Sequence, residues 1–150
     1  IFSGKTIAFT PAHHAHYKTS FNIINENYIF GVGPKIFREI CTDKQFLVTD
    51  GCSTHPHNTY IQLLAETGII GFLILFSLFV YCLIMILKQL YTKFLKQKSF
   101  VSDYYICIII AIFINFWPIM PTGNFFNNWI SVIYYIPIGF ALYFKYDEQK

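Results

Sequence analysis

Apolar and polar positions change their pattern near residue 68 of the chain. Residues 68–87, GIIGFLILFSLFVYCLIMIL, form a run of twenty residues with no charge and no polar stripe. As a helix this run would be about 30 Å long, which is the thickness of a bilayer core. A buried helix in a soluble protein usually keeps one polar face, so the run predicts a membrane span.

Two later runs have the same character. Residues 104–120 and 129–144 carry no charged side chain, and a short stretch of turn-forming residues separates them. Pro118 is expected to end or kink the first run near one interface, and Pro137 to kink the second. The predicted fold class is therefore all-α, a polytopic membrane protein with three transmembrane helices within residues 68–150.

The part of the chain before residue 68 is more polar and is predicted to be a helical segment outside the bilayer. One-face spacing of apolar residues predicts a helix over residues 17–28, and GVGPK then breaks the chain before a second helix over about residues 34–41. A third helix is expected to begin near Asn58 and to continue into the first span. Glu66, about one turn before the span, is expected to need a partner because a carboxylate near the bilayer is costly.

The distribution of charge sets the expected orientation. Only 13% of the residues are charged, about half of the share in typical soluble domains. Residues 88–103 carry four lysines and one acid, which is typical of a cytoplasmic loop. Residues 1–67 and 121–128 are then expected on the outer side. Since the excess of basic residues flanks the spans, it indicates topology and no binding to nucleic acid.

The start of the sequence suggests that the chain is part of something longer. It begins with Ile1 in the middle of a pattern, and no charged-then-apolar secretory signal is present. We therefore expect a C-terminal piece of a larger membrane protein. A transporter component is one alternative, but transporter spans usually carry ionisable groups near the membrane centre, whereas here the polar groups gather outside the runs.

His57 and Asn58 lie at the expected start of the third helix, next to the membrane surface. Histidine is the side chain best suited to move a proton near neutral pH, and a helix N-terminus disfavours its protonated form. His57 is therefore a candidate general base for a hydroxyl nucleophile whose electrophile is carried by a lipid. The alternative is structural: Asn58 or Thr59 caps the helix, His57 is a loop residue, and Gly68 and Gly71 allow close helix packing.

The spacing H-N-x9-G-x-x-G over residues 57–71 resembles the signature of the O-antigen ligase and polymerase superfamily of bacterial envelope proteins. The longer string GCSTHPHNTYIQLLAETGIIGF resembles that family closely, and YIFGVGPKIFREIC resembles its upstream glycine-rich segment. The string PIMPTGNFFNNW is similar to the family's late periplasmic loop. Together the three strings extend the resemblance over about residues 13–140.

This resemblance implies a GT-C-like glycosyltransferase in the bacterial inner membrane, with its active site facing the periplasm. Such an enzyme moves a glycan from undecaprenyl diphosphate to an acceptor hydroxyl. The acceptor is the lipid A core in ligases, another repeat unit in polymerases and a protein in related enzymes, and the choice among them stays open. The resemblance also implies that no metal, nucleotide or other cofactor is needed, and that the essential histidine corresponds to His57.

A diphosphate leaving group calls for cationic contacts. Arg38 is the only arginine in the chain, and arginine binds phosphate with a planar fork while lysine acts as a point charge. Arg38 and Lys35, beside the GVGP turn, are therefore candidate diphosphate contacts. The alternative for Arg38 is a solvated helix face, with a local pair to Glu39 or Asp43.

Further polar residues flank the candidate base. His55 is predicted to orient His57 or to bind glycan, and Asn58 to contact substrate as well as to cap the helix. The HHAH motif at residues 13–16 is interpreted as a flexible loop, one histidine of which is a candidate for lining the acceptor groove. No carboxylate or cysteine lies close to the motif in the sequence, so no metal is expected there; a structural membrane protein with a metal-binding histidine loop is the alternative.

The four cysteines fall into two groups. Cys41 and Cys52 bracket a loop on the side predicted to be oxidising, so a disulfide is expected between them. In the chain-entropy model it would contribute about 3 kcal/mol and fix the approach to the HPHN motif. Cys82 and Cys107 lie in predicted spans and are interpreted as inert apolar side chains.

Overall fold

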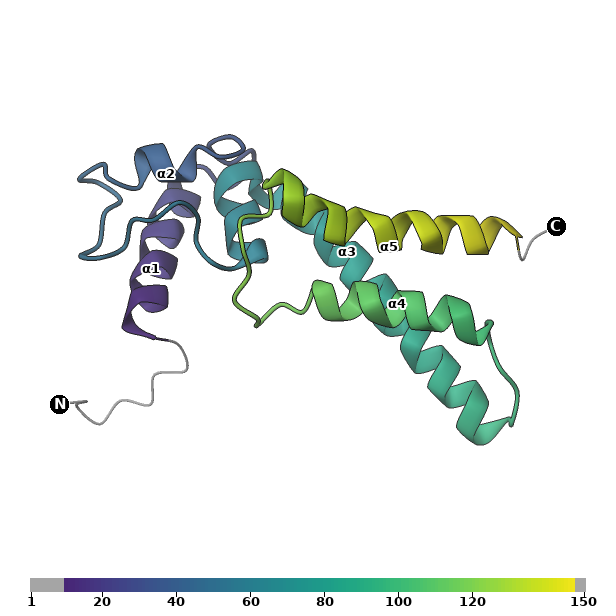
Figure 1. The fold of residues 1–150 in the computed structure, drawn as a ribbon. Coiled ribbons are helices and arrows are strands. Elements are labelled where there is room, and N and C mark those ends of the chain that lie inside the picture. The colour runs from purple at the N-terminus through teal and green to yellow at the C-terminus, as the bar shows by residue number, and fades with distance from the viewer. Residues whose placement is uncertain (1–9, 148–150) are drawn as a thin grey trace. The chain divides into compact units, whose positions relative to one another are not determined.

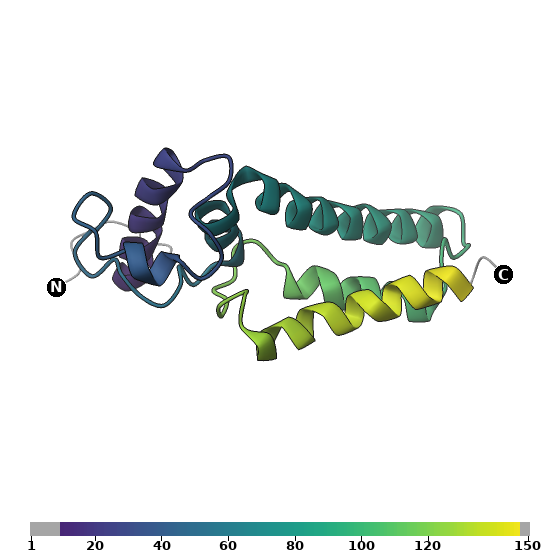
Figure 2. The same cartoon turned by 90° about the horizontal axis from the view of Figure 1, so that it is seen from above.

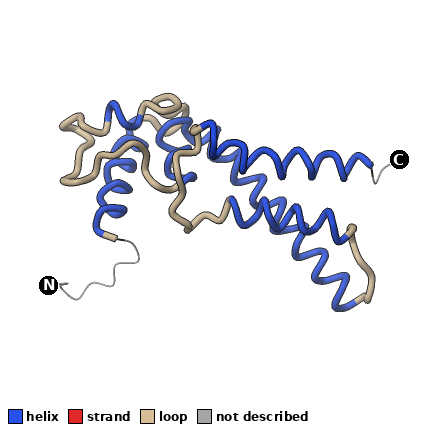
Figure 3. Tube along the Cα trace, in the orientation of Figure 1, coloured by secondary structure: helices blue, strands red, loops and turns tan. Residues whose placement is uncertain are grey.

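The computed structural model describes residues 10–147, and every regular element among them is a helix (Figure 3). In chain order the elements are α1 (Pro11–Glu26), α2 (Phe37–Ile40), α3 (Thr59–Leu95), α4 (Asp103–Asn115) and α5 (Asn128–Asp147) (Figure 1). The all-α prediction is confirmed over these residues. They form two compact units: a first unit of residues 10–72 and 121–126, and a second unit of residues 73–120 and 127–147.

Helix α3 is long and apolar enough to cross a membrane, and among the described residues it is the one helix that meets both conditions. Helix α4 is apolar but has 13 residues, fewer than the roughly 20 that a span usually needs. The span predicted over residues 68–87 therefore falls on α3. The spans over residues 104–120 and 129–144 fall on α4 and α5, and three crossings remain a prediction.

Local capping decides where the helices of the first unit begin. Helix α1 begins before the predicted residue 17, because the hydroxyl of Thr10 caps it and Pro11 fills its first turn. The HHAH motif is therefore helical, and the expectation of a flexible loop there is wrong. Helix α2 is shorter than predicted because the backbone of Lys35 is left-handed, with a φ of 66°, and the helix begins only at Phe37.

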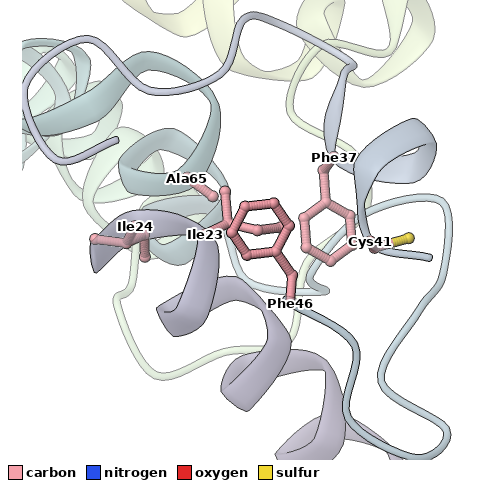
Figure 4. Close-up of a cluster of buried hydrophobic side chains, with 6 residues drawn as sticks. All are labelled: Ile23, Ile24, Phe37, Cys41, Phe46 and Ala65. Atoms are coloured by element: carbon pink, nitrogen blue, oxygen red, sulfur yellow. The ribbon is translucent and has the colours of Figure 1, made fainter. Parts of the chain in front are cut away.

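A small apolar core holds the first unit together (Figure 4). Its six buried members come from α1, α2, the loop after α2 and α3: Ile23, Ile24, Phe37, Cys41, Phe46 and Ala65. Burial of a large apolar side chain contributes about 1.5–3 kcal/mol. The structure also joins Cys41 to Cys52 by a disulfide, with Cα atoms 5.1 Å apart, a separation typical of such bonds.

Two glycines allow the loop before α2 to cross α3 at backbone contact. Gly68 has a φ of 66° and a ψ of −165°, a conformation essentially restricted to glycine, and it interrupts the helical geometry of α3. A Cβ at Gly68 would overlap the carbonyl oxygen of Ile29, and a Cβ at Gly31 would overlap the carbonyl carbon of Glu66. Gly68 therefore allows the loop before α2 to cross α3 closely. The sequence alone suggested close packing of a neighbouring helix at this glycine.

Aromatic rings lie at several contacts between the helices of the second unit. Helix α4 packs along α5 (Figure 2), and α3 meets α4 where the ring of Phe79 stacks on that of Phe113, 5.0 Å between centroids. Trp117 adds an edge contact to both rings. The hydroxyls of Tyr81 and Tyr105 are 3.1 Å apart. Many large apolar side chains of this unit are exposed, as expected for helices that face lipid or protein partners.

Candidate functional site

The loop before α3 ends in a helix cap. Oδ1 of Asn58 accepts hydrogen bonds from the amides of Tyr60 (3.0 Å) and Ile61 (3.1 Å), so it satisfies two of the amides that a first helical turn leaves unpaired. His57 precedes this cap with a left-handed φ of 60°. Such a backbone is uncommon for a residue with a side chain, and it occurs often at functional sites.

Three other histidines gather around His57. The ring centroid of His57 lies 4.1 Å from that of His55, 5.4 Å from that of His16 and 5.5 Å from that of His13. His13 and His16 are three residues apart on α1, so they lie on one face of the helix. His14 is exposed to solvent. The fold therefore brings two members of the HHAH motif to the HPHN loop, and we call His13, His16, His55 and His57 the histidine cluster.

Burial and mutual repulsion keep His57 neutral. Loss of solvent lowers the pKa of His57, and the charges that His55, His16 and His13 would carry lower it further, to about 4. At neutral pH the imidazole is unprotonated, which is the state that a general base requires. Within residues 10–147 no hydrogen bond is made to the ring of His57, so neither nitrogen is engaged by a side chain or backbone group of the described residues.

The ring of His55 is engaged by the protein itself. Its Nε2 lies 3.3 Å from the carbonyl oxygen of Thr122, and since a carbonyl only accepts, Nε2 carries the proton. Nδ1 then accepts from the hydroxyl of Thr54 at 2.9 Å. Burial lowers the pKa of His55 and repulsion from His16 adds to this, while the bond to Thr122 opposes it. With both nitrogens occupied, His55 is suited to holding the ring of His57 in place.

His16 has a buried ring nitrogen that lacks a hydrogen-bond partner among the described residues. This nitrogen is Nδ1, and the side chain as a whole is buried. A buried polar atom without a partner is costly unless a water or a ligand meets it. Because the ring of His16 also contacts that of His57, His16 is a candidate contact for the group on which His57 acts. The sequence alone did not distinguish it from its neighbours in the HHAH motif.

Residues 121–126, far along the sequence, complete the site. The amide of Thr122 donates to the carbonyl of His57 at 3.0 Å, and its hydroxyl lies 2.8 Å from that of Thr59. Its carbonyl accepts from His55, as described above. One threonine therefore holds both histidines of the HPHN loop and the first residue of α3.

A buried glutamine joins this late loop to α3. Gln62 is fully buried, and its Nε2 donates to Oδ1 of Asn124 and to Oε2 of Glu66, both at 2.9 Å. Its Oε1 accepts from the amide of Phe125 at 2.9 Å. Glu66 accepts in turn from the amide of Phe37 at 3.0 Å. The sequence indicated that Glu66 needs a partner but missed Gln62; the i, i+4 spacing of the two was the available signal.

Arg38 and Lys35 interact with Glu66, Arg38 through its charge and Lys35 through its backbone. No contact joins them to the histidine cluster within the described residues. Burial raises the pKa of Glu66, while hydrogen bonds from Gln62 and from the backbones of Phe37 and Lys35, and the charge of Arg38, lower it. Both cationic side chains are exposed. In the part of the chain that the structure describes, the one ion pair joins other residues, so the local pair considered for Arg38 is not formed.

Within residues 10–147 these features define an all-helical protein, with one helix long and apolar enough to cross a membrane and with a histidine cluster in the first unit. Residues 13–76 match the model of the O-antigen ligase family, and the resemblance to this family is confirmed over that segment. Neither the curated proteins nor the solved structures gave a match. O-antigen ligases are an inner-membrane family, and α3 fits that setting.

The matched segment contains α1, α2, the HPHN loop and the first part of α3. It therefore includes all four members of the histidine cluster, together with Gln62 and Glu66. The late loop of residues 121–126 lies outside the match, and its similarity to the family's late periplasmic loop remains a prediction.

Proposed function

We propose that this chain is part of a membrane glycosyltransferase of the O-antigen ligase or polymerase type, with His57 as its general base. The observation that carries the proposal is a neutral imidazole with unengaged nitrogens, packed among three other histidines inside the segment that matches the family. The donor, a glycan on undecaprenyl diphosphate, and the acceptor, a lipid A core sugar or a growing O-antigen, are parts of the proposal.

In the proposed reaction an acceptor hydroxyl gives its proton to an open nitrogen of His57. Its oxygen bonds to the anomeric carbon of the donor sugar, the bond from that carbon to the diphosphate breaks, and the diphosphate leaves with the electron pair. A diphosphate is a stable anion, so the reaction needs a base on one side and cationic contacts on the other. Atoms and charge balance without a metal or a nucleotide.

The remaining predicted site residues have supporting roles in this proposal. His55, whose two nitrogens are engaged, orients His57, and Asn58 caps α3 and contacts substrate from the same position. Arg38 binds the diphosphate with its planar fork, since its guanidinium is exposed and forms no ion pair within the described residues. Lys35 adds a point charge beside it.

We place the histidine cluster at the periplasmic face of the bacterial inner membrane, with α3, α4 and α5 as crossings. The chain leaves the first unit after residue 72 and returns to it at residue 121. This supports an even number of crossings between those residues, which α3 and α4 supply. The lysine-rich stretch of residues 88–103 then lies on the cytoplasmic side, in agreement with the positive-inside rule.

The alternatives considered from the sequence gain no support from the site. In the described part of the chain, no group of three or more histidine, cysteine, aspartate or glutamate side chains is arranged to hold a metal ion. The buried carboxylate of Glu66 and its partner Gln62 lie in the first unit, before the apolar part of α3. They are therefore not the mid-membrane ionisable groups that transport sites use.

Replacement of His57 in the full-length protein tests the proposal. Asparagine tolerates a left-handed backbone and lacks a base, so His57→Asn and His57→Ala should both lower glycan transfer by about 10²- to 10⁴-fold. His14→Ala is the matched control, since His14 is the exposed member of the HHAH motif and lies outside the histidine cluster. Near-normal transfer by His57→Asn at normal expression would exclude the base.

The pH dependence of transfer gives a second readout. Because the pKa of His57 is about 4, transfer should stay level as the pH falls from about 7 to about 5, and decline only near 4. The ordinary histidine pKa is about 6.5, so the unfolded chain takes up the proton first, and this group's contribution to stability is lost as the pH falls from about 6.5 to about 4. A decline in transfer centred near 6.5 would contradict a neutral, crowded His57.

A further inference from the structure

Three consecutive large side chains of the first unit lie in a loop and face away from its core. Tyr28, Ile29 and Phe30 follow α1 directly, and they are 54%, 57% and 76% exposed. No charged residue lies between Glu26 and Lys35. An exposed apolar patch of this kind usually marks a contact surface. The apolar core of the same unit is formed by other residues.

Backbone hydrogen bonds fix this loop against the start of the apolar part of α3. Because Gly68 breaks the helical geometry, the amide of Ile69 is released from α3 and donates to the carbonyl of Tyr28 at 2.9 Å. On the other side of the loop, the amide of Val32 donates to the carbonyl of Ala65 at 3.0 Å. The loop is therefore held at the level where the membrane-crossing run begins.

The next residue of α3 extends the same apolar surface. Ile70 is about half exposed and follows Ile69 on the apolar run. Aromatic side chains such as Tyr28 and Phe30 are favoured at the level of the headgroups and the first part of the acyl chains. The surface is thus joined to the apolar run of α3 through the two backbone hydrogen bonds described above.

We propose that Tyr28, Ile29 and Phe30 insert into the interfacial region of the bilayer, in the leaflet from which α3 enters. The loop then acts as an apolar anchor that sets the height of the first unit above the membrane. The occupant of the surface is lipid. The inference rests on α3 crossing the membrane, and it does not depend on the reaction assigned to His57.

Fluorescence quenching by lipid tests the anchor in the full-length protein. Phe30→Trp is introduced into a variant whose native tryptophans are replaced by phenylalanine, and the protein is reconstituted into phosphatidylcholine vesicles with bromine on the acyl chains. Leu47→Trp is the matched control, because Leu47 is an exposed loop residue of the same unit without a backbone bond to α3. Ile29→Trp serves as a second reporter if Phe30→Trp lowers expression.

The tryptophan at position 30 or 29 should emit at shorter wavelength than the one at position 47, lose most of its emission in brominated vesicles, and resist quenching by aqueous acrylamide. Equal bromine quenching at positions 30 and 47 would overturn the proposal. Protection from both bromine and acrylamide would also overturn it, because the surface would then be covered by protein. Adding His57→Asn should leave the quenching unchanged, so this result and the catalytic test can fail separately.

Discussion

The two units of the chain differ in the contacts that join segments far apart in the sequence. In the first unit, Gln62 and Thr122 form hydrogen bonds between segments more than sixty residues apart in the sequence. In the second unit, helices meet through aromatic rings such as Phe79 and Phe113. Hydrogen bonds are directional and costly to leave unmade, whereas apolar packing tolerates substitutions of similar volume. The proposed chemistry lies in the unit whose distant segments are joined by directional bonds.

The largest effect on stability is expected at Gly68. Gly68→Ala combines a backbone that only glycine adopts easily with an overlap against Ile29, so it should destabilise the first unit by about 4 kcal/mol. Gly139→Ala in α5 is the matched control, since a Cβ there meets nothing within 4 Å and alanine is the better helix former. Thermal unfolding in detergent measures both. Equal melting temperatures for the two variants would show that the close contact between Gly68 and the loop before α2 does not stabilise the first unit.

The disulfide is expected to rank next. Cys41→Ser should cost about 3 kcal/mol in the chain-entropy model, because the unfolded chain loses its cross-link. Cys41 also lies in the core of the first unit, where a hydroxyl packs less well than sulfur. Cys107→Ser, at an exposed free thiol of the second unit, should have little effect. Mass mapping of non-reduced peptides checks the bond itself. Detection of both thiols as free would reject the pairing, whatever the effect on stability.

Loss of the side-chain amide of Gln62 should have a smaller effect on stability than loss of the disulfide, but a larger effect on the geometry of the site. Gln62→Leu removes the acceptor for the backbone N–H of Phe125 and the donor to Asn124 and Glu66, at a cost of about 2 kcal/mol. Hydrogen exchange of the backbone N–H groups of residues 121–126, measured by mass spectrometry, should become faster. Gln45→Leu, at an exposed position of the same unit, is the control. Unchanged exchange in Gln62→Leu would show that other contacts hold the late loop.

The smallest effect is expected in the second unit. Tyr81→Phe removes the bond between the hydroxyls of Tyr81 and Tyr105 and keeps the ring, so it should cost less than about 1 kcal/mol. Unfolding in detergent measures the difference. A loss above about 2 kcal/mol would mean that the second unit also relies on directional bonds, and the contrast between the units would not hold.

The sequence predicted the helices better than it predicted their ends. The long apolar run predicted the apolar part of α3, and Asn58 marked the beginning of that helix within one residue. The beginning of α1 was missed because the Thr10 and Pro11 signal lies before the apolar spacing that was used. The break at Gly68 was missed because a glycine inside an apolar run is equally compatible with helix packing.

The sequence by itself determined that residues 10–147 are helical and include an apolar helix long enough for a bilayer, and it predicted His57, beside a helix cap, as the candidate base. These properties depend on neighbouring residues, through periodicity, hydropathy and capping. Only the tertiary structure decided that His13 and His16 join His57, and that Gln62 and Thr122 hold the late loop against the HPHN loop. Such contacts join segments far apart in the chain, and no local pattern specifies which distant partner a buried polar group will meet.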